Sequence, residues 1–252
     1  MSALSAISLS GLPEIHRGDD LAAVIYECAR GQHRLSDAQI VVIAHKVVSK
    51  AEGAVVTLAE VTPGERAREL ARGLGKDARA VQVVLDQSQE IVRLANGILI
   101  ARTHHGFVCA NAGVDASNAA GEEELIVLPA DPDGSARRLR ARLRELCGFA
   151  PAVLITDSFG RAWRHGQCDI AIGCAGVRVL EDWRGLKDSV GRTLHATWIA
   201  IADGIAATAD LARSKDSREP VVIVEGLERL ISAEDGPGAI ALLRAPAEDL
   251  FR

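Results

Sequence analysis

The 252-residue sequence lacks the patterns that mark membrane, secreted and nucleic-acid-binding proteins. No apolar run reaches about 18 residues, the length at which a membrane-spanning helix is expected. Residues 1–9 lack the basic segment and the long apolar segment of a secretory signal. The net charge of −5 argues against a general nucleic-acid binder, which usually carries a basic face. A local basic pocket for a phosphorylated small molecule remains compatible with this charge.

Paired cysteines are also lacking. The chain has five cysteines, an odd number, and no two of them form a CxxC pair: Cys28, Cys109, Cys147, Cys168 and Cys174. This spacing argues against a disulfide framework and against a zinc site. We therefore predict reduced thiols in a cytoplasmic protein.

Two glycine-rich phosphate-binding loops are missing as well. There is no GxxxxGK[ST] motif, since residues 73–76 lack the spacing, and no GxGxxG follows a strand. Any nucleotide must therefore be held by other groups. Helical and strand patterns do not alternate strictly, and no repeat or Pro/Ser-rich linker occurs. We predict an α+β fold with mixed or antiparallel sheets, neither a P-loop nor a Rossmann fold.

The sequence does contain clear apolar runs and helical patterns. Runs typical of strands occur at residues 38–44, 97–101, 106–110, 124–128, 152–155, 176–180 and 220–224. Helical patterns cover residues 21–29, closed by Gly31, and residues 62–74, 131–147 and 194–211. The helix at 131–147 is rich in arginine, and we expect these arginines to form a solvated face.

The most informative stretch is residues 151–173. We expect its strand to stop at Thr156-Asp157-Ser158 and to be followed by a basic loop that contains Arg161, Arg164 and His165. A carboxylate and a hydroxyl are hard oxygen ligands for Mg²⁺ or Mn²⁺, and arginines donate to phosphoryl groups. The alternative is a strand, a helix cap and a solvated turn.

Three other polar segments are candidates for ligand contacts. Residues 45–53 directly follow a buried strand and contain two lysines and a serine. This composition suits either a contact to a nucleotide phosphate or a solvated loop. Asp115 and Asn118 lie three residues apart and can face one ligand, or can merely shape a turn. His104 and His105 are either loop residues or contacts to a phosphate or carboxylate.

Four segments in order, residues 12–15, 46–53, 112–118 and 155–167, resemble those of the coenzyme F420 glutamate ligases. The resemblance implies a GTP-dependent enzyme that joins L-glutamate to the deazaflavin precursor, coenzyme F420-0. It implies Mg²⁺ or Mn²⁺, two ions rather than one, with K⁺ as a candidate monovalent ion. It also implies two intertwined α+β lobes and a homodimer. We expect one domain over residues 1–252, without the C-terminal flavin domain of some relatives.

The resemblance assigns roles to particular residues. Asp115 and Asp157 are the expected metal ligands, and the hydroxyl of Ser158, where threonine is common, completes that site. The nucleotide is expected to contact Leu12, Pro13, Glu14, Ile15, Lys50 and Asn118. Residues 212–219 are expected to lie along it, including Lys215. His45 stands beside the nucleotide, where the family has a small hydroxyl residue.

The implied reaction activates a carboxylate. The γ-phosphoryl group of GTP passes to the terminal carboxylate of the coenzyme, and the glutamate amine then displaces phosphate from the acyl phosphate, in one round or several. Arg161, Arg164 and Lys50 are expected to stabilise the developing charge. The alternatives are a metal-dependent phosphatase or phosphotransferase, and a non-catalytic nucleotide-binding regulator.

Overall fold

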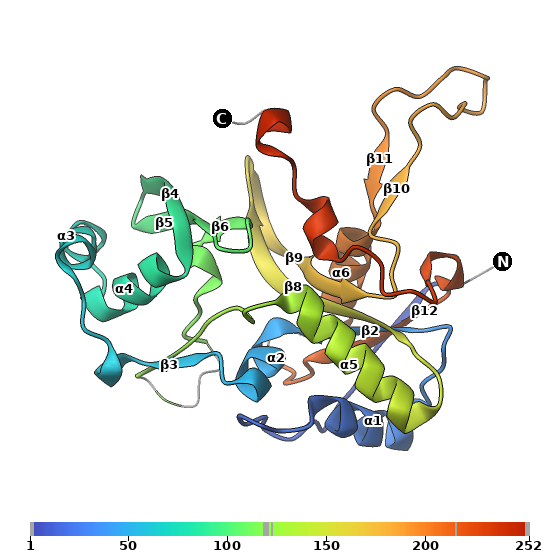
Figure 1. The fold of residues 1–252 in the computed structure, drawn as a ribbon, viewed down its shortest axis with the longest axis horizontal. Coiled ribbons are helices and arrows are strands. Elements are labelled where there is room, and N and C mark those ends of the chain that lie inside the picture. Colours follow the sequence, from blue (N-terminus) through green and yellow to red (C-terminus); the bar gives the residue numbers. More distant parts are fainter. Residues whose placement is uncertain (1–2, 118–120, 122, 215, 250–252) are drawn as a thin grey trace.

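The computed structural model describes residues 3–117, 121, 123–214 and 216–249 (Figure 1). Its centre is a five-stranded sheet in the order β1-β12-β2-β8-β9. The strands are β1 (Ser5–Ser8), β12 (Val221–Glu225), β2 (Ile40–Ala44), β8 (Ala152–Arg161) and β9 (Arg164–Ala175). β2 and β8 are parallel, and the other neighbours are antiparallel. The predicted mixed-sheet α+β fold is confirmed.

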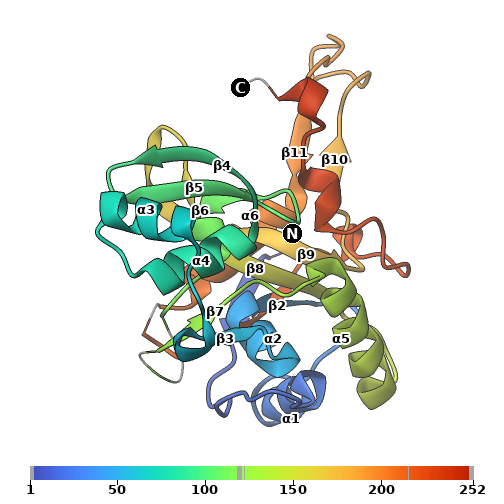
Figure 2. The ribbon, with the colours of Figure 1, turned by 60° about the vertical axis from the view of Figure 1, so that its left-hand side comes forward.

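Helices cover both faces of this sheet. α1 (Leu21–Gln32), α2 (His45–Glu52) and α5 (Pro132–Cys147) pack on one face, and α6 (Ile201–Ala212) packs on the other (Figures 1 and 2). Alternate residues of a strand point to opposite faces, so Val41 joins the first layer and Val42 the second. Because both faces are covered, β2 is a continuous apolar run without polar alternation.

Two smaller parts flank the central sheet. One lobe consists of α3 (Glu65–Leu74), α4 (Ala78–Asp86) and the sheet β4 (Ser88–Ala95), β5 (Ile98–Thr103) and β6 (Val108–Ala110). The pair β3 (Val55–Thr57) and β7 (Glu124–Ile126) connects this lobe to the body (Figure 1). The ribbon of β10 (Leu180–Asp182) and β11 (Trp198–Ala200) extends outward from the opposite side (Figure 2).

Single 3₁₀ turns complete the chain, at Leu58–Glu60, Asn111–Gly113, Glu228–Leu230, Ala239–Leu242 and Pro246–Glu248. No helix within the described residues has the length and apolar character needed to cross a membrane.

The structure corrects two predictions at the centre of the sequence. Helix α2 occupies His45–Glu52 and is capped by Gly53 in a left-handed conformation, so the solvated loop given as one of two alternatives for residues 45–53 is wrong. The strand expected to stop at residues 156–158 continues to Arg161 as β8, because β9 pairs with it along that length. The expected basic loop is therefore a strand hairpin.

Several element boundaries also differ. α1 runs through Gly31 and ends at Gln32, and α3 begins at Glu65 rather than at residue 62. The expected helix at 194–211 begins only at Ile201, since residues 198–200 pair with β10 as β11. The strand expected at 176–180 is reduced to β10, which begins at Leu180.

The arginines of α5 are not all solvated. Arg140 is 4% exposed, and its guanidinium donates to Asp235 Oδ1 at 2.7 Å and to the Ser232 carbonyl at 2.6 Å. The expectation of a wholly solvated arginine face is therefore wrong at this position. Arg140 instead fixes the segment that follows β12 against α5.

Candidate functional site

The topology brings four separate segments to one edge of the central sheet. β1 and β2 are both antiparallel to β12, so both end where β12 begins. The Leu9 amide donates to the Val221 carbonyl, and the Ala44 amide donates to the Pro220 carbonyl. We call this the carboxyl edge; it comprises residues 10–15, 45–50, 157–158, and 213–214 with 216–220. In open sheets, ligands commonly bind outside the carboxyl ends of the strands.

β8 extends past this edge. Its pairing with the parallel strand β2 stops at Ala44 and Thr156, where the chain turns into α2. Asp157 and Ser158 follow immediately and flank the point where β2 ends. As consecutive strand residues they point to opposite sides: Asp157 contacts His45 of α2, and Ser158 contacts Asp169 of β9.

Asp157 lies against the first turn of α2. His45 is 2% exposed, and its Nε2 lies 3.3 Å from Asp157 Oδ1, at the distance of an ion pair but without hydrogen-bond alignment. His45 Nδ1 lies 3.2 Å from Ser49 Oγ. Asp157 Oδ1 also accepts from the Ser158 amide at 2.8 Å. Cys109 of β6 is buried, and this burial together with the charge of Asp157 raises the pKa of its thiol to about 12.

Asp115 is paired with Lys46 of α2, the residue that follows His45. Lys46 Nζ lies 2.6 Å from Asp115 Oδ2, and the Ser117 amide donates to Asp115 Oδ1 at 2.7 Å, which closes the turn foreseen as an alternative. Burial alone would raise the pKa of Asp115, but these two partners hold it below its ordinary value. Adjacent residues of α2 therefore connect both predicted metal ligands to one helix start.

The predicted nucleotide contacts after β1 also reach α2. Lys50 Nζ bonds Glu14 Oε1, and the Lys50 side chain is 12% exposed. Pro13 and Glu14 are exposed, whereas Ile15 is buried in the core and Leu12 packs against that core. The side chains of Pro13 and Glu14 are thus the accessible ones in this segment.

A buried polar network that sequence reasoning missed lies behind Ser158. Its centre is Asp169, which is 2% exposed. Ser158 Oγ donates to Asp169 Oδ1 at 2.6 Å, Thr156 Oγ1 donates to Asp169 Oδ2 at 2.8 Å, and Arg213 bonds the same Oδ2. The available signal in the sequence was a carboxylate directly before the apolar run at residues 170–175.

The two predicted catalytic arginines lie at the tip of the β8–β9 hairpin. Arg161 pairs with Arg164 across a two-residue turn that contains Trp163, which is 82% exposed. Arg161 donates to the His165 carbonyl at 2.6 Å, within the hairpin itself. Arg161 lies four positions beyond Asp157 along the strand, about 13 Å away at ~3.3 Å per residue. Their catalytic role stays a prediction.

The remaining predicted residues have separate positions. Asn118 and Lys215 lie outside the described residues. His104 Nε2 and His105 Nε2 each lie 2.9 Å from a backbone carbonyl, of Asp86 and Pro129 respectively. Each ring is therefore engaged within the protein, as expected of loop histidines.

The carboxyl edge suits a hard metal ion in the kind of donor it offers. Within the described residues, no three or more His, Cys, Asp or Glu side chains gather as a ready metal cluster. The carboxylates of Asp115 and Asp157 and the hydroxyl of Ser158 nonetheless are the oxygen donors that Mg²⁺ and Mn²⁺ prefer. The residues present fit such an ion by chemistry.

Two cavities lie near these elements. One, of about 230 Å³, has Asp115 in its wall, an apolar floor that includes Val81 and Leu99, and Lys76 Nζ bonded to Asn111 Oδ1 at 3.1 Å.

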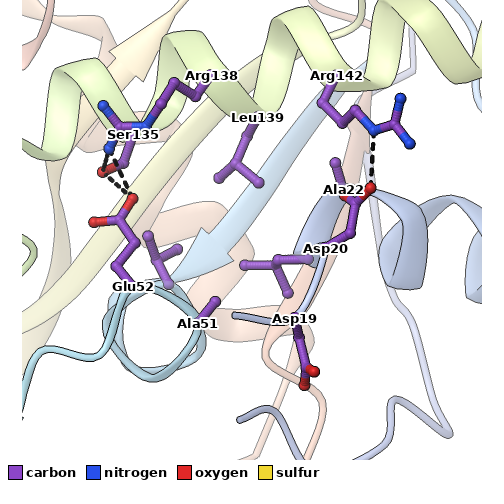
Figure 3. Close-up of a pocket in the computed structure, with 11 residues that line it drawn as sticks. Asp19, Asp20, Ala22, Ala51, Glu52, Ser135, Arg138, Leu139 and Arg142 are labelled. Atoms are coloured by element: carbon purple, nitrogen blue, oxygen red, sulfur yellow. Dashed lines mark hydrogen bonds and ion pairs between the residues drawn. The ribbon is translucent and has the colours of Figure 1, made fainter. Parts of the chain in front are cut away.

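The other cavity, of about 180 Å³, lies between α1, α2 and α5 (Figure 3). Its arginines are already paired with acids, Arg138 with Glu52 and Arg142 with Asp20, each at 2.8 Å. This second cavity therefore offers no surplus positive charge to an anion.

Comparison with known proteins supports the resemblance. The family model described as F420-0:Gamma-glutamyl ligase matches residues 11–226. Proteins named coenzyme F420:L-glutamate ligase are similar along nearly their whole length. That of Methanopyrus kandleri is 44% identical, covering 100% of both chains, and that of Methanothermobacter thermautotrophicus is 40% identical, covering 99% of each. That of Archaeoglobus fulgidus is 42% identical, covering 97% of this chain and 94% of the other. The chain belongs to the F420-0:gamma-glutamyl ligase family.

Proposed function

We propose that the protein is a coenzyme F420-0:L-glutamate ligase, which forms an amide between the terminal carboxylate of the coenzyme and the amine of L-glutamate. The observation that carries this proposal is the end-to-end similarity to proteins that bear that name. The carboxyl edge supports it, because three of the four segments behind the resemblance meet there although they are far apart in sequence, and Asp115 of the fourth is paired with Lys46.

We further propose GTP as the source of activation. The edge offers lysines and a helix start to a polyphosphate: Lys46 and Lys50 lie on α2, whose first turn carries the positive end of the helix dipole. A carboxylate oxygen of the coenzyme attacks the γ-phosphorus, and GDP leaves. The glutamate amine then attacks the acyl carbon and expels phosphate, and the ammonium proton passes to a base. The cycle can repeat to add further γ-linked glutamates.

The protein's part in these steps is to bind and orient. Asp115 and Asp157 would hold Mg²⁺ or Mn²⁺, two ions in our proposal, with Ser158; the ions would neutralise charge on the phosphoryl oxygens. Lys46 and Lys50 would hold the phosphates. A K⁺ requirement, a homodimer and a cytoplasmic location are further proposals that rest on the resemblance and the cysteine pattern.

The ion pairs of the edge imply that metal and nucleotide bind together. Asp115 is paired with Lys46, and Glu14 with Lys50. A cation that takes the acids releases the lysines, and a polyphosphate that takes the lysines releases the acids. We therefore expect Mn²⁺ to bind at least tenfold more tightly with GDP present. Calorimetric Mn²⁺ affinities that are equal with and without GDP would contradict this exchange.

One assay separates the proposed function from its alternatives. Purified protein, Mn²⁺ and F420-0 are incubated with GTP or ATP, with and without L-glutamate, and the products are read by mass spectrometry. A ligase gives a glutamyl adduct only when glutamate is present, with GTP preferred. Phosphate release that does not depend on glutamate would indicate a phosphatase, and binding without turnover would indicate a regulator.

A further inference from the structure

We propose that Asp169 is a positioning residue of this site, which fixes the role of the Ser158 hydroxyl and anchors the segment that follows Arg213. The proposal deepens the function proposed above and rests on it. Asp169 lies on β9 directly opposite Ser158 in the strand register. At 2% exposure it is too buried to reach a ligand itself, so it must act through its neighbours.

The first neighbour is Ser158. A hydroxyl has one proton to donate and two lone pairs to offer. Ser158 Oγ directs its proton to Asp169 Oδ1 at 2.6 Å, the short distance typical of a hydrogen bond to a charged acceptor. Any further partner of this oxygen therefore meets lone pairs, which suit a cation or an N–H donor. Asp169 thus makes Ser158 an oxygen ligand, in the way that outer-shell carboxylates orient metal ligands elsewhere.

The second neighbour is Arg213, the first residue after α6. Its side chain is 10% exposed and bonds Asp169 Oδ2, and it donates to Thr156 Oγ1 at 3.1 Å and to the Pro220 carbonyl at 3.0 Å. Pro220 is also held by the amide of Ala44 at the end of β2. The resemblance places residues 212–219 along the nucleotide; Arg213 lies at the start of this segment, and Pro220 directly follows its end. The charge of Asp169 therefore fixes both ends through one guanidinium.

The two oxygens of Asp169 serve the two roles separately. Oδ1 receives Ser158, and Oδ2 receives Thr156 and Arg213. An amide in place of the carboxylate cannot accept on both sides. If its nitrogen faces Ser158, the hydroxyl must accept and turn its proton outward. If it faces Arg213, two donors oppose each other.

The chain supplies a matched control at the far end of α2. Glu52 Oε1 accepts the Ser135 hydroxyl at 2.6 Å and Arg138 at 2.8 Å, so it too binds a hydroxyl and a guanidinium, as Asp169 does (Figure 3). Glu52 is not part of the carboxyl edge. Glu52→Gln therefore removes a carboxylate with a hydroxyl and an arginine partner outside the proposed site, at a position that is 31% exposed.

The test measures Mn²⁺ binding by electron paramagnetic resonance in the presence of GDP, together with kcat and KM for GTP. We expect Asp169→Asn to weaken Mn²⁺ binding by about 10–100-fold and to raise the KM for GTP, with Glu52→Gln within twofold of wild type. If Asp169→Asn does not fold, Asp169→Asn/Arg213→Met, which leaves no buried charge, gives the same readout. Wild-type Mn²⁺ affinity in the folded single or double variant would overturn the positioning role. A wild-type protein that forms no glutamyl adduct would overturn the proposed function instead, whatever the variants bind.

Discussion

Replacing Arg213 by methionine tests the buried network independently of any ligand. Methionine keeps much of the length of the side chain but removes the charge that faces Asp169. Asp169 is 2% exposed and would retain only the hydroxyls of Thr156 and Ser158 as donors. Leaving one charge of a buried pair without its partner costs about 3–5 kcal/mol. The Pro220 carbonyl loses one of two donors, since the Ala44 amide remains, and adds little to the cost.

A second substitution, Asp169→Asn, tests the same network, because its effect on the free energy of unfolding should change sign between two backgrounds. In the wild type, Asp169→Asn should destabilise, because Arg213 loses its counter-charge. In the Arg213→Met background, the same change removes an uncompensated buried carboxylate and should stabilise. We expect a coupling energy of about 2–3 kcal/mol in the double-mutant cycle.

The assay is equilibrium urea unfolding followed by far-ultraviolet circular dichroism, with an unchanged dependence on urea as the check on two-state behaviour. Additive single effects, or an Arg213→Met cost below about 1 kcal/mol, would refute the reasoning, because the network would then not carry a buried, compensated charge.

Three further predictions concern single side chains. Asp157→Asn should abolish ligation and leave the urea midpoint nearly unchanged; near wild-type turnover at ordinary metal concentration would remove Asp157 from the site. His45→Ser should change the KM for GTP, since His45 contacts Asp157 at the carboxyl edge, and an unchanged KM would exclude it. Burial raises the pKa of Asp203 although it accepts from the Ala171 amide. The folded state therefore binds more protons between the unfolded and folded pKa values, and stability falls as pH rises through that window. Asp203→Asn keeps the acceptor, so urea unfolding should show it to be more stable than wild type at neutral pH and to lose this advantage in acid.

Local signals in the sequence predicted the central strands β2 and β12 and several helix ends correctly. The runs that became β2 and β12 are continuous and β-branched, as strands buried on both faces must be. Asp20 and Asp131 cap the helices they precede, and Gly75 ends α3 in a left-handed conformation. Each of these features depends on residues within a few positions of one another.

α2 and α6 were missed or misplaced because their starts carry no such signal. Ala44 and Ala200 precede them, and neither has a side chain that can cap a helix. Val47 and Val48 also favour a strand by propensity. Packing against the central sheet decides the conformation here, and no window of sequence contains that information.

The same limit explains what was missed in the site. The polar residues of β8 were expected to end the strand, since polar groups need partners that a local reading does not supply. Their partners lie on other elements. Asp157 contacts His45 of α2, and Ser158 donates to Asp169 of β9. Thr156 also donates to Asp169 and accepts from Arg213 at the end of α6. With these partners in place, a strand can carry hydroxyls and a carboxylate into a buried region. Asp169 was overlooked because its hydrogen-bond partners lie on β8 and at the end of α6 rather than on its own strand β9.

The position of β12 explains why segments so distant in sequence share one edge. β12 comes late in the chain, yet it inserts between β1 and β2 and runs antiparallel to both. That insertion makes β1 and β2 point the same way, so residues 12–15 and residues 45–50 leave the sheet side by side. β8 is parallel to β2 and longer, so Asp157 emerges at the same edge. If β1 paired antiparallel to β2 directly, its following segment would lie at the opposite edge, and Glu14 would not reach Lys50. The site therefore depends on strand order as much as on the residues that line it.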